Sequence, residues 1–334
     1  MDDAWTGADL HRVATLYYVQ EETMEAIAQR LGISRSTVSR QLKEARRRGI
    51  VRISVGGPTQ ADSVASAFLE RFGVRAHVVS VRETATDAHR LGQVARVAAR
   101  LISDWMDNGA TLGLAWGTTT STVVENLVPK PTRGATVVQM NGAVHATSAQ
   151  VMYVSDLLGR ACEAFEARPV FFPVPAFFDD PATKAALWRE RSVRHVVDVQ
   201  HACDIVVFGV GSWRGAMTSQ VYAGGYLDTK DLAAVQAAGA VGDICTVFVR
   251  ADGSYEDIAL NARSSGPDLS RLAELPRRMC VAAGSARVPA VTGALRAGAV
   301  TDLVIDERTA AELLAWKDVE RRWPTSDPAA AADV

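Results

Sequence analysis

Apolar positions in the first fifty residues recur at the three- and four-residue spacing of helices. The first predicted helix rests on Leu10, Val13, Leu16 and Tyr17. A second helix is predicted between Thr23, a residue that caps helix N-termini, and Gly32, a residue that ends helices. Ser34 can cap a third helix that runs to about residue 47, and positions 50–55 then alternate like a short strand.

Beyond residue 58 the pattern changes, because short β-rich apolar runs alternate with longer helical segments. The expected strands are 76–81, 111–115, 135–140, 169–172, 205–209, 244–249, 278–282 and 303–305. The expected helices are 88–106, 121–127, 151–163, 183–189, 229–238 and 288–297. This alternation is typical of a parallel sheet with helices on both faces, so the expected fold class is α/β.

The turn residues Gly56, Gly57 and Pro58 mark a domain boundary. We therefore expect a small all-α helix-turn-helix domain over 1–55, a linker over 56–62 and a doubly wound sheet domain over 63–323. The last segment, 324–334, is rich in Ala, Pro and Asp and is expected to be a disordered tail.

The block 24–42 meets the requirements of a helix-turn-helix. Two helices cross closely when the crossing point is small, the turn accepts a left-handed residue and the second helix returns an apolar side chain, as Ala28, Gly32 and Val38 do. Hydroxyls and guanidiniums on the outward face of the third helix could reach base edges and phosphates. The candidate DNA-binding residues are Ser34, Arg35, Ser36, Thr37, Ser39, Arg40, Lys43 and Arg47. A plain helical hairpin would have the same apolar pattern.

Charge is distributed unevenly. The whole chain of 334 residues has a net charge of -2, yet residues 29–52 carry eight basic side chains and one acidic one. A basic patch near a terminus indicates a polyanionic partner, although a solvated helix face would have the same composition. The 48% hydrophobic content predicts a globular chain with a sizeable core.

Uncharged stretches, the N-terminus and the cysteines bear on where the protein is expected to act. The longest stretch without charged residues, 134–155, contains several polar side chains, and no secretory signal is visible at the N-terminus. The four cysteines have neither pairing nor metal-ligand spacing. We expect a cytoplasmic protein without a membrane span, metal or cofactor.

The loop that begins Trp116-Gly-Thr-Thr-Thr-Ser follows an expected strand and precedes a helix near Ser121. Such a turn offers backbone N–H groups and hydroxyls to an anion, most naturally a phosphate, and Gly117 permits close approach. The same sequence can equally be a plain helix cap.

Motifs in a fixed order from about residue 10 to 315 resemble the SorC family of bacterial sugar-responsive transcriptional regulators. The resemblance starts in the N-terminal block, through Arg47-Arg-Gly-Ile-Val-Arg-Ile-Ser-Val. It continues in Gly113-Leu-Ala-Trp-Gly-Thr-Thr, Val138-Gln-Met-Asn-Gly, Phe172-Pro-Val-Pro-Ala, Phe208-Gly-Val-Gly-Ser, Gly239-Ala-Val-Gly-Asp-Ile and Val281-Ala-Ala-Gly-Ser-Ala-Arg.

The resemblance implies a Rossmann-like effector domain, related in fold to sugar-phosphate isomerases, that binds a sugar or polyol phosphate and assembles as a dimer or tetramer. It assigns the phosphate to Gly117, Thr118 and Thr119, and the sugar to Asn141, Gly209, Gly211 and Asp243. Arg287 stands where many relatives carry a Lys that reaches the phosphate.

Two departures from the family's pattern refine this expectation. Some relatives place a Schiff-base Lys at the position of Asn141, and since an amide cannot form that bond, we expect reversible binding. Ala223 and Gly224 replace a basic residue that many relatives have, which argues against a bisphosphate effector.

The sequence thus predicts a DNA-binding transcriptional regulator of a carbohydrate or polyol catabolic operon, controlled by a phosphorylated sugar or polyol. Its expected partners are double-stranded operator DNA, that effector and further copies of itself. The alternative is an isomerase-like enzyme with an accessory DNA-binding domain. The histidines stand in no recognisable acid/base motif, so no catalytic residue is assigned, and His145 is the one worth testing.

Overall fold

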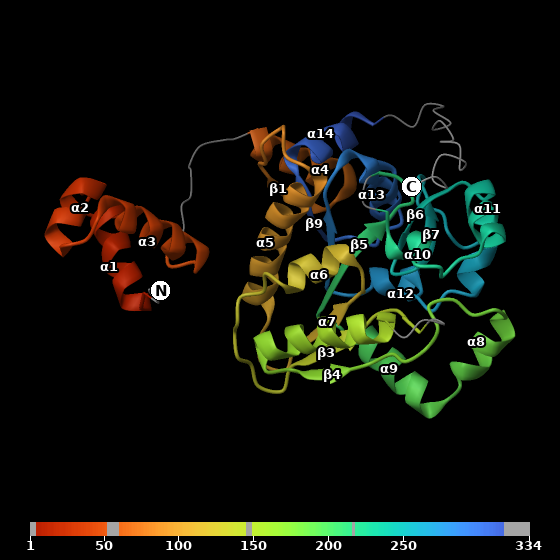
Figure 1. The fold of residues 1–334 in the computed structure, drawn as a ribbon. Coiled ribbons are helices and arrows are strands. Elements are labelled where there is room, and N and C mark those ends of the chain that lie inside the picture. Colours follow the sequence, from red (N-terminus) through yellow and green to blue (C-terminus); the bar gives the residue numbers. More distant parts are fainter. Residues whose placement is uncertain (1–4, 52–59, 145–148, 216–217, 317–334) are drawn as a thin grey trace. The chain divides into compact units, whose positions relative to one another are not determined.

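The computed structural model describes residues 5–51, 60–144, 149–215 and 218–316 (Figure 1). The chain divides into two compact units, 1–58 and 59–334, and each is described by itself. Four expectations lie outside the described residues in whole or in part: the strand at positions 52–55, positions 56–59 of the linker, the test position His145 and the tail over 324–334.

The first unit contains three helices among its described residues: α1 Gly7–Tyr18, α2 Met24–Leu31 and α3 Arg35–Arg47. The expected caps are confirmed. Thr23 accepts a hydrogen bond from an amide of the first turn of α2, and Gly32 ends that helix at φ +66°. Ser34 Oγ accepts from Thr37 N at 3.0 Å and so fixes the start of α3.

The three helices meet in a small apolar core. Its buried side chains are Val13, Leu16, Ile27, Ala28, Val38 and Leu42. A second cluster joins the start of α1 to the end of α3 through Leu10, Ala14 and Ala45. Val38 is fully buried, which by apolar transfer alone stabilises the unit by about 2 kcal/mol. The predicted helix-turn-helix core is confirmed, since α2 and α3 bury the expected faces against α1.

The second unit is built on a sheet of nine strands among its described residues. The strands are β1 Arg75–Val79, β2 Thr111–Leu114, β3 Thr136–Gln139, β4 Arg168–Val170, β5 Ile205–Gly211, β6 Ala240–Ile244, β7 Val247–Arg250, β8 Arg277–Ala282 and β9 Asp302–Asp306. Seven of them form a parallel sheet in the order β1-β9-β8-β5-β2-β3-β4, and β6 and β7 extend β5 as an antiparallel hairpin.

Helices connect these strands (Figure 1). They are α4 Gln60–Phe72, α5 Asp87–Trp105, α6 Thr118–Val124, α7 Ala149–Phe165, α8 Pro181–Leu187, α9 Arg191–His201, α10 Gln220–Ala223, α11 Thr229–Ala237, α12 Leu269–Ala273, α13 Val288–Arg296 and α14 Glu307–Ala315, with 3-10 helices η1 Ala259–Ala262 and η2 Ser285–Arg287. Helix α4 begins at Gln60, inside the expected linker 56–62, and α6 begins at Thr118, three residues before the expected start.

Alternation along β5 shows that both faces of the sheet are covered. Ile205 and Val207 belong to the apolar cluster that α5, α6 and α7 complete, whereas Val206 and Phe208 belong to the cluster that α4, α9, α13 and α14 complete. Successive side chains of a strand point to opposite faces, so a continuous apolar run is what a doubly covered strand requires. The predicted α/β fold with helices on both faces is confirmed.

One predicted element is wrong. The run 244–249 was expected to be a single strand, but β6 and β7 turn back on each other after Ile244, which pairs with Val247. The two turn residues, Cys245 and Thr246, have φ of +49° and +71°. Tight hairpin turns of this kind are usually signalled by Asn-Gly or Asp-Gly, and Cys-Thr gives no such signal.

The strand order reverses direction between β2 and β5. From β2 the chain proceeds outward through β3 to β4, and it then returns to place β5 on the other side of β2. The loops that leave the carboxyl ends of β2 and β5 therefore diverge, and open α/β sheets bind ligands in the crevice that such a switch point creates.

Candidate ligand pocket and nucleic-acid interface

A polar cavity lies at this switch point. It encloses about 730 Å³ of space, its open mouth included. The loops that follow β2, β3, β5, β6 and β8 all contribute to its wall. The structure brings every predicted effector-binding residue to this cavity: Gly117, Thr118, Thr119, Asn141, Gly209, Gly211, Asp243 and Arg287.

The β2 loop forms the first wall. Gly117 is the N-cap of α6, with φ +150° and no side chain to cap the helix. The first helical hydrogen bond runs from Ser121 N to Gly117 O at 2.9 Å, so Thr118 and Thr119 stand in the first turn instead of capping it. A Cβ at Gly209 would lie 2.9 Å from the Thr119 Cβ, so glycine is needed in β5 for the two elements to approach.

Asn141 follows β3 and is almost completely buried. Its backbone is held in place, because Gln139 Nε2 donates to Asn141 O at 2.7 Å. Its side-chain Oδ1 has no hydrogen-bond partner among the described residues. An unsatisfied buried acceptor costs about 1–3 kcal/mol, which favours a donor group on a ligand in this cavity.

Asp243 lies near the end of β6, where it pairs with Gly211 of β5. A Cβ at Gly211 would lie 1.7 Å from Asp243 Oδ1, so the carboxylate occupies the space that this glycine leaves. Tyr222 Oη donates to Oδ1 at 2.9 Å and Thr246 N donates to Oδ2 at 3.0 Å. Burial raises the pKa of Asp243 to about 6, although these two hydrogen bonds and the nearby charge of Arg287 lower it.

Arg287 closes the cavity from η2. Its guanidinium donates to Val210 O at 3.0 Å. Burial lowers the pKa of Arg287, while the charge of Asp243 opposes that effect. The described lining of the cavity therefore carries one cation, Arg287, and one carboxylate, Asp243, among hydroxyls, amides and apolar groups.

Sequence reasoning missed three aromatic side chains that shape this site. Tyr222 on α10 holds Asp243. Trp116 stacks on Tyr226 with ring centroids 5.1 Å apart, and its Nε1 donates to Gly142 O at 2.8 Å. Tyr226 Oη in turn donates to Ala143 O at 3.2 Å. Trp116 lies within the motif Gly113-Leu-Ala-Trp-Gly-Thr-Thr and could have been singled out from it, whereas no motif pointed to Tyr222.

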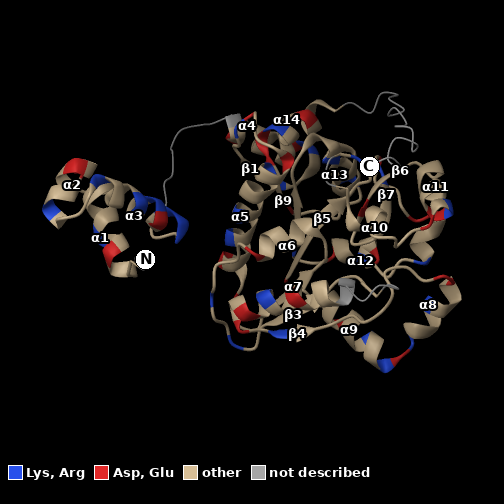
Figure 2. Ribbon diagram, viewed as in Figure 1, with Lys and Arg blue, Asp and Glu red and all other residues tan. Residues whose placement is uncertain are grey.

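The candidate DNA-binding residues share the outer surface of α3. Seven of them are exposed and Thr37 is half-buried. In Figure 2 the blue Lys and Arg segments gather along this helix. The exposed positions are Ser34, Arg35, Ser36, Ser39, Arg40, Lys43 and Arg47.

Neighbouring groups orient several of these cations. Arg35 lies 3.8 Å from the Glu25 carboxylate, and the Arg40 guanidinium lies over the Trp5 ring. Arg47 Nε donates to Glu44 at 2.6 Å. Hydrogen bonds from Arg47 and then Arg48 lower the pKa of Glu44 to about 2. Glu44 therefore keeps its charge at neutral pH and offsets part of the positive potential at the end of α3.

Within the described residues, no group of three or more His, Cys, Asp or Glu side chains could hold a metal ion. None of the helices in the described ranges is long and apolar enough to cross a membrane.

A helix-turn-helix unit joined to an α/β unit with a polar pocket at its switch point defines the class of ligand-responsive DNA-binding proteins. The family described as "Putative sugar-binding domain" matches residues 57–315, and sigma-70 region 4 matches residues 11–48. The deoxyribonucleoside regulator of Bacillus subtilis is 32% identical over 90% of this chain and 95% of its own.

Solved structures agree with this class. A domain of a possible sugar-binding transcriptional regulator from Arthrobacter aurescens is 42% identical, with a TM-score of 0.72 over 78% of this chain and all of that one. The full-length sorbitol operon regulator SorC of Klebsiella pneumoniae shares the fold, with 24% identity and a TM-score of 0.68 over 91% of this chain and 98% of its own. The chain belongs to the SorC family of sugar-responsive transcriptional regulators, as its motifs predicted.

Proposed function

We propose that this DNA-binding regulator controls a carbohydrate or polyol catabolic operon, and that a phosphorylated sugar or polyol binds reversibly in the switch-point cavity. The observation that carries the proposal is the convergence of eight predicted positions, from five separate segments of the chain, on one polar cavity whose described lining has one cation, Arg287. Two relatives, a deoxyribonucleoside regulator and a sorbitol operon regulator, support the same class of effector by their names.

The phosphate is assigned to the β2 loop. The amides and hydroxyls of Thr118 and Thr119 provide donors, and Gly117 lets an anion approach the backbone. Arg287 faces the same cavity and can bind phosphate through two parallel N–H bonds. One cation in the described lining favours a ligand with one phosphate over a ligand with two, so we infer a monophosphate effector.

The sugar hydroxyls are assigned to the opposite wall. The unpartnered Asn141 Oδ1 accepts one hydroxyl proton, and Asp243 accepts others with the lone pairs that Tyr222 and Thr246 leave. Asn141 holds the effector without a covalent bond. The protein acts as a regulator in the cytoplasm and not as an enzyme.

Tight, specific binding to operator DNA requires more than one copy of the chain. A single helix-turn-helix buries too little DNA surface for tight specific binding, and a two-fold oligomer doubles the site. We propose that the effector favours one arrangement of protomers over another and so changes the spacing of their α3 helices.

The test is fluorescence-anisotropy binding to DNA from upstream of the protein's own operon, at fixed salt, with a panel of sugar and polyol phosphates and their unphosphorylated forms. Arg35→Ala should abolish specific DNA binding and leave effector binding intact. Thr118→Ala should bind operator like the wild type and lose the effector response. Reversed phenotypes, or turnover of a panel member without specific DNA binding, would refute the proposal.

A further inference from the structure

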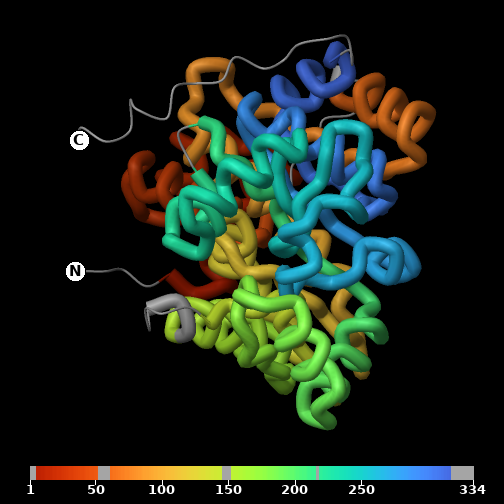
Figure 3. Tube along the Cα trace, turned by 90° about the vertical axis from the view of Figure 1, so that its right-hand side faces the viewer, coloured from red at the N-terminus to blue at the C-terminus, as the bar shows by residue number. Residues whose placement is uncertain are grey.

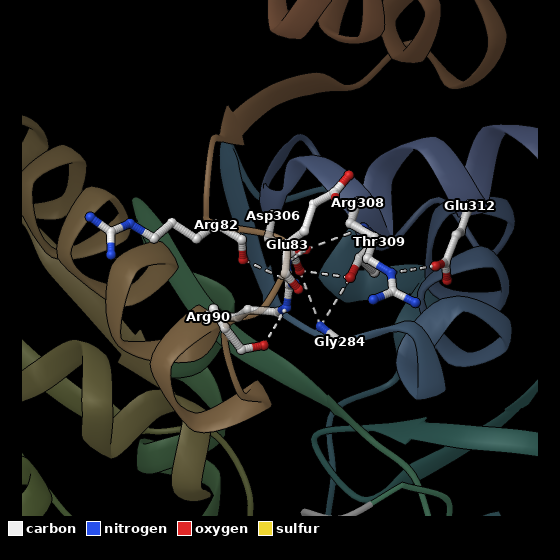
Figure 4. A network of polar contacts seen from close by, with 9 residues as sticks. Arg82, Glu83, Arg90, Gly284, Asp306, Arg308, Thr309 and Glu312 are labelled. Atoms are coloured by element: carbon white, nitrogen blue, oxygen red, sulfur yellow. Dashed lines mark hydrogen bonds and ion pairs between the residues drawn. The ribbon is translucent and has the colours of Figure 1, made fainter.

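A buried polar network joins the ends of β8 and β9 to α5 (Figure 4). Its centre is Asp306, the last residue of β9 and the N-cap of α14, which is completely buried. Thr309 Oγ1 donates to Asp306 Oδ2 at 2.6 Å, and Thr309 N donates to Oδ1 at 3.2 Å. Gly284 N, which follows β8, donates to Asp306 Oδ2 at 3.1 Å and to Thr309 Oγ1 at 3.0 Å. The end of β8 is thus fastened to the end of β9.

Arg90 of α5 supplies the counter-charge and is itself 3% exposed. Its Nη1 donates to Asp306 Oδ1 at 3.2 Å. Three further bonds from the guanidinium, from Nε and Nη2, go to backbone carbonyls of the loop between β1 and α5, those of Arg82, Glu83 and Ala85. A buried charge that is paired and held by several hydrogen bonds fixes geometry, because moving any member leaves a charge or donor unsatisfied.

The backbone connects this network to the cavity, because neighbours of its residues along the chain line the cavity. Ala283, directly before Gly284, and Arg287, the last residue of η2, both line the cavity, and so does Leu91, the neighbour of Arg90. Gly284 has φ +91°, and its carbonyl accepts from Arg287 N at 3.0 Å. The direction in which the Arg287 guanidinium leaves the backbone therefore depends on how Gly284 is held.

We propose that Asp306, Thr309 and Arg90 are positioning residues for effector binding: they fix Gly284 so that η2 presents Arg287 to the phosphate of the effector. This inference rests on the proposed function, because it takes Arg287 as a phosphate ligand. The three residues act through Gly284 and η2, and their contribution is to preorganise the site before the ligand arrives.

The test uses Thr309→Val in the full chain, since valine keeps the shape of threonine and leaves the charges of Asp306 and Arg90 paired. The probe is inorganic phosphate, titrated by isothermal calorimetry. We expect Thr309→Val to weaken phosphate binding by about tenfold, the value of one well-formed hydrogen bond, and Thr309→Ser to restore it. Operator affinity without ligand should equal that of the wild type in both variants.

The variant Arg287→Gln distinguishes a positioning role of Thr309 from a general destabilisation of the site. If Thr309 acts through Arg287, the double variant should bind phosphate no more weakly than Arg287→Gln alone. Wild-type phosphate affinity in Thr309→Val, or a double variant whose losses multiply, would overturn the positioning role and leave the proposed function standing. Equal phosphate binding by the wild type and Arg287→Gln would instead refute the assigned phosphate site and this inference with it.

Discussion

Replacing Asp243 by Asn should stabilise the free protein at neutral pH. The carboxylate is buried above Gly211, and its oxygens accept from Tyr222 Oη and Thr246 N. An amide fits the same contacts, since its oxygen can accept from Thr246 N while its NH₂ group donates to the Tyr222 hydroxyl. The substitution therefore removes a buried charge without leaving a donor unpaired.

The magnitude follows from the pKa of Asp243, which burial raises from 3.8 to about 6. A displacement of this size corresponds to about 3 kcal/mol between the protonated and ionised forms. Below about pH 4 the carboxyl group is protonated in both the folded and the unfolded chain, and its contribution to stability is complete. As the pH rises through 6 the folded chain must hold a buried charge, and that contribution is lost.

The assay is urea denaturation of the wild type and Asp243→Asn from pH 4 to pH 8. The variant should match the wild type near pH 4 and exceed its free energy of unfolding by up to about 3 kcal/mol at pH 7.5. Asp104→Asn, at an exposed carboxylate of α5, is the matched control and should show no such pH-dependent difference. A difference between wild type and Asp243→Asn that does not change with pH would refute the reasoning.

Three further predictions concern single contacts. Gly211→Ala should abolish the effector response in a ligand titration, because the new Cβ would lie 1.7 Å from Asp243 Oδ1; a normal response would contradict the close packing. Ser34→Ala should lower the stability of the helical unit by about 1 kcal/mol through loss of the α3 cap, whereas Ser39→Ala should not, as thermal denaturation can show. Lys43→Ala should reduce the salt dependence of operator affinity by about one counterion without changing sequence preference; an unchanged slope would place Lys43 away from the phosphates.

Local signals were sufficient for the helix-turn-helix and for most of the sheet. Thr23, Gly32 and Ser34 end or begin helices by contacts within a few residues, so their effect is visible in sequence. The alternation of short apolar runs with helical segments predicted a parallel sheet covered on both faces, because that alternation is also visible locally along the chain. Helix α4 was not predicted, and its packing on β1 and α14 (Figure 3), with Arg71 donating to Leu314 O at 2.8 Å, is a long-range contact.

The effector residues themselves came from motif order, and their convergence came from strand order. No local rule states that β5 lies beside β2, yet that neighbour relation is what brings Thr119 against Gly209 and creates the cavity. The hairpin of β6 and β7 was missed because Cys245 and Thr246 adopt left-handed backbone conformations without the usual turn residues. That hairpin then determines where Asp243 lies.

The sequence by itself determined the two-part organisation, the helix-turn-helix with its basic third helix and the identities of the polar residues, because caps, periodicity and charge act over short distances. Only the tertiary structure decided which of these residues line the same cavity. The buried Asp243 carboxylate, the unpartnered Asn141 oxygen and the fastening of Gly284 by Asp306 all depend on segments that are far apart in the chain. Their energies arise from burial and from hydrogen bonds that exist only once the sheet has closed.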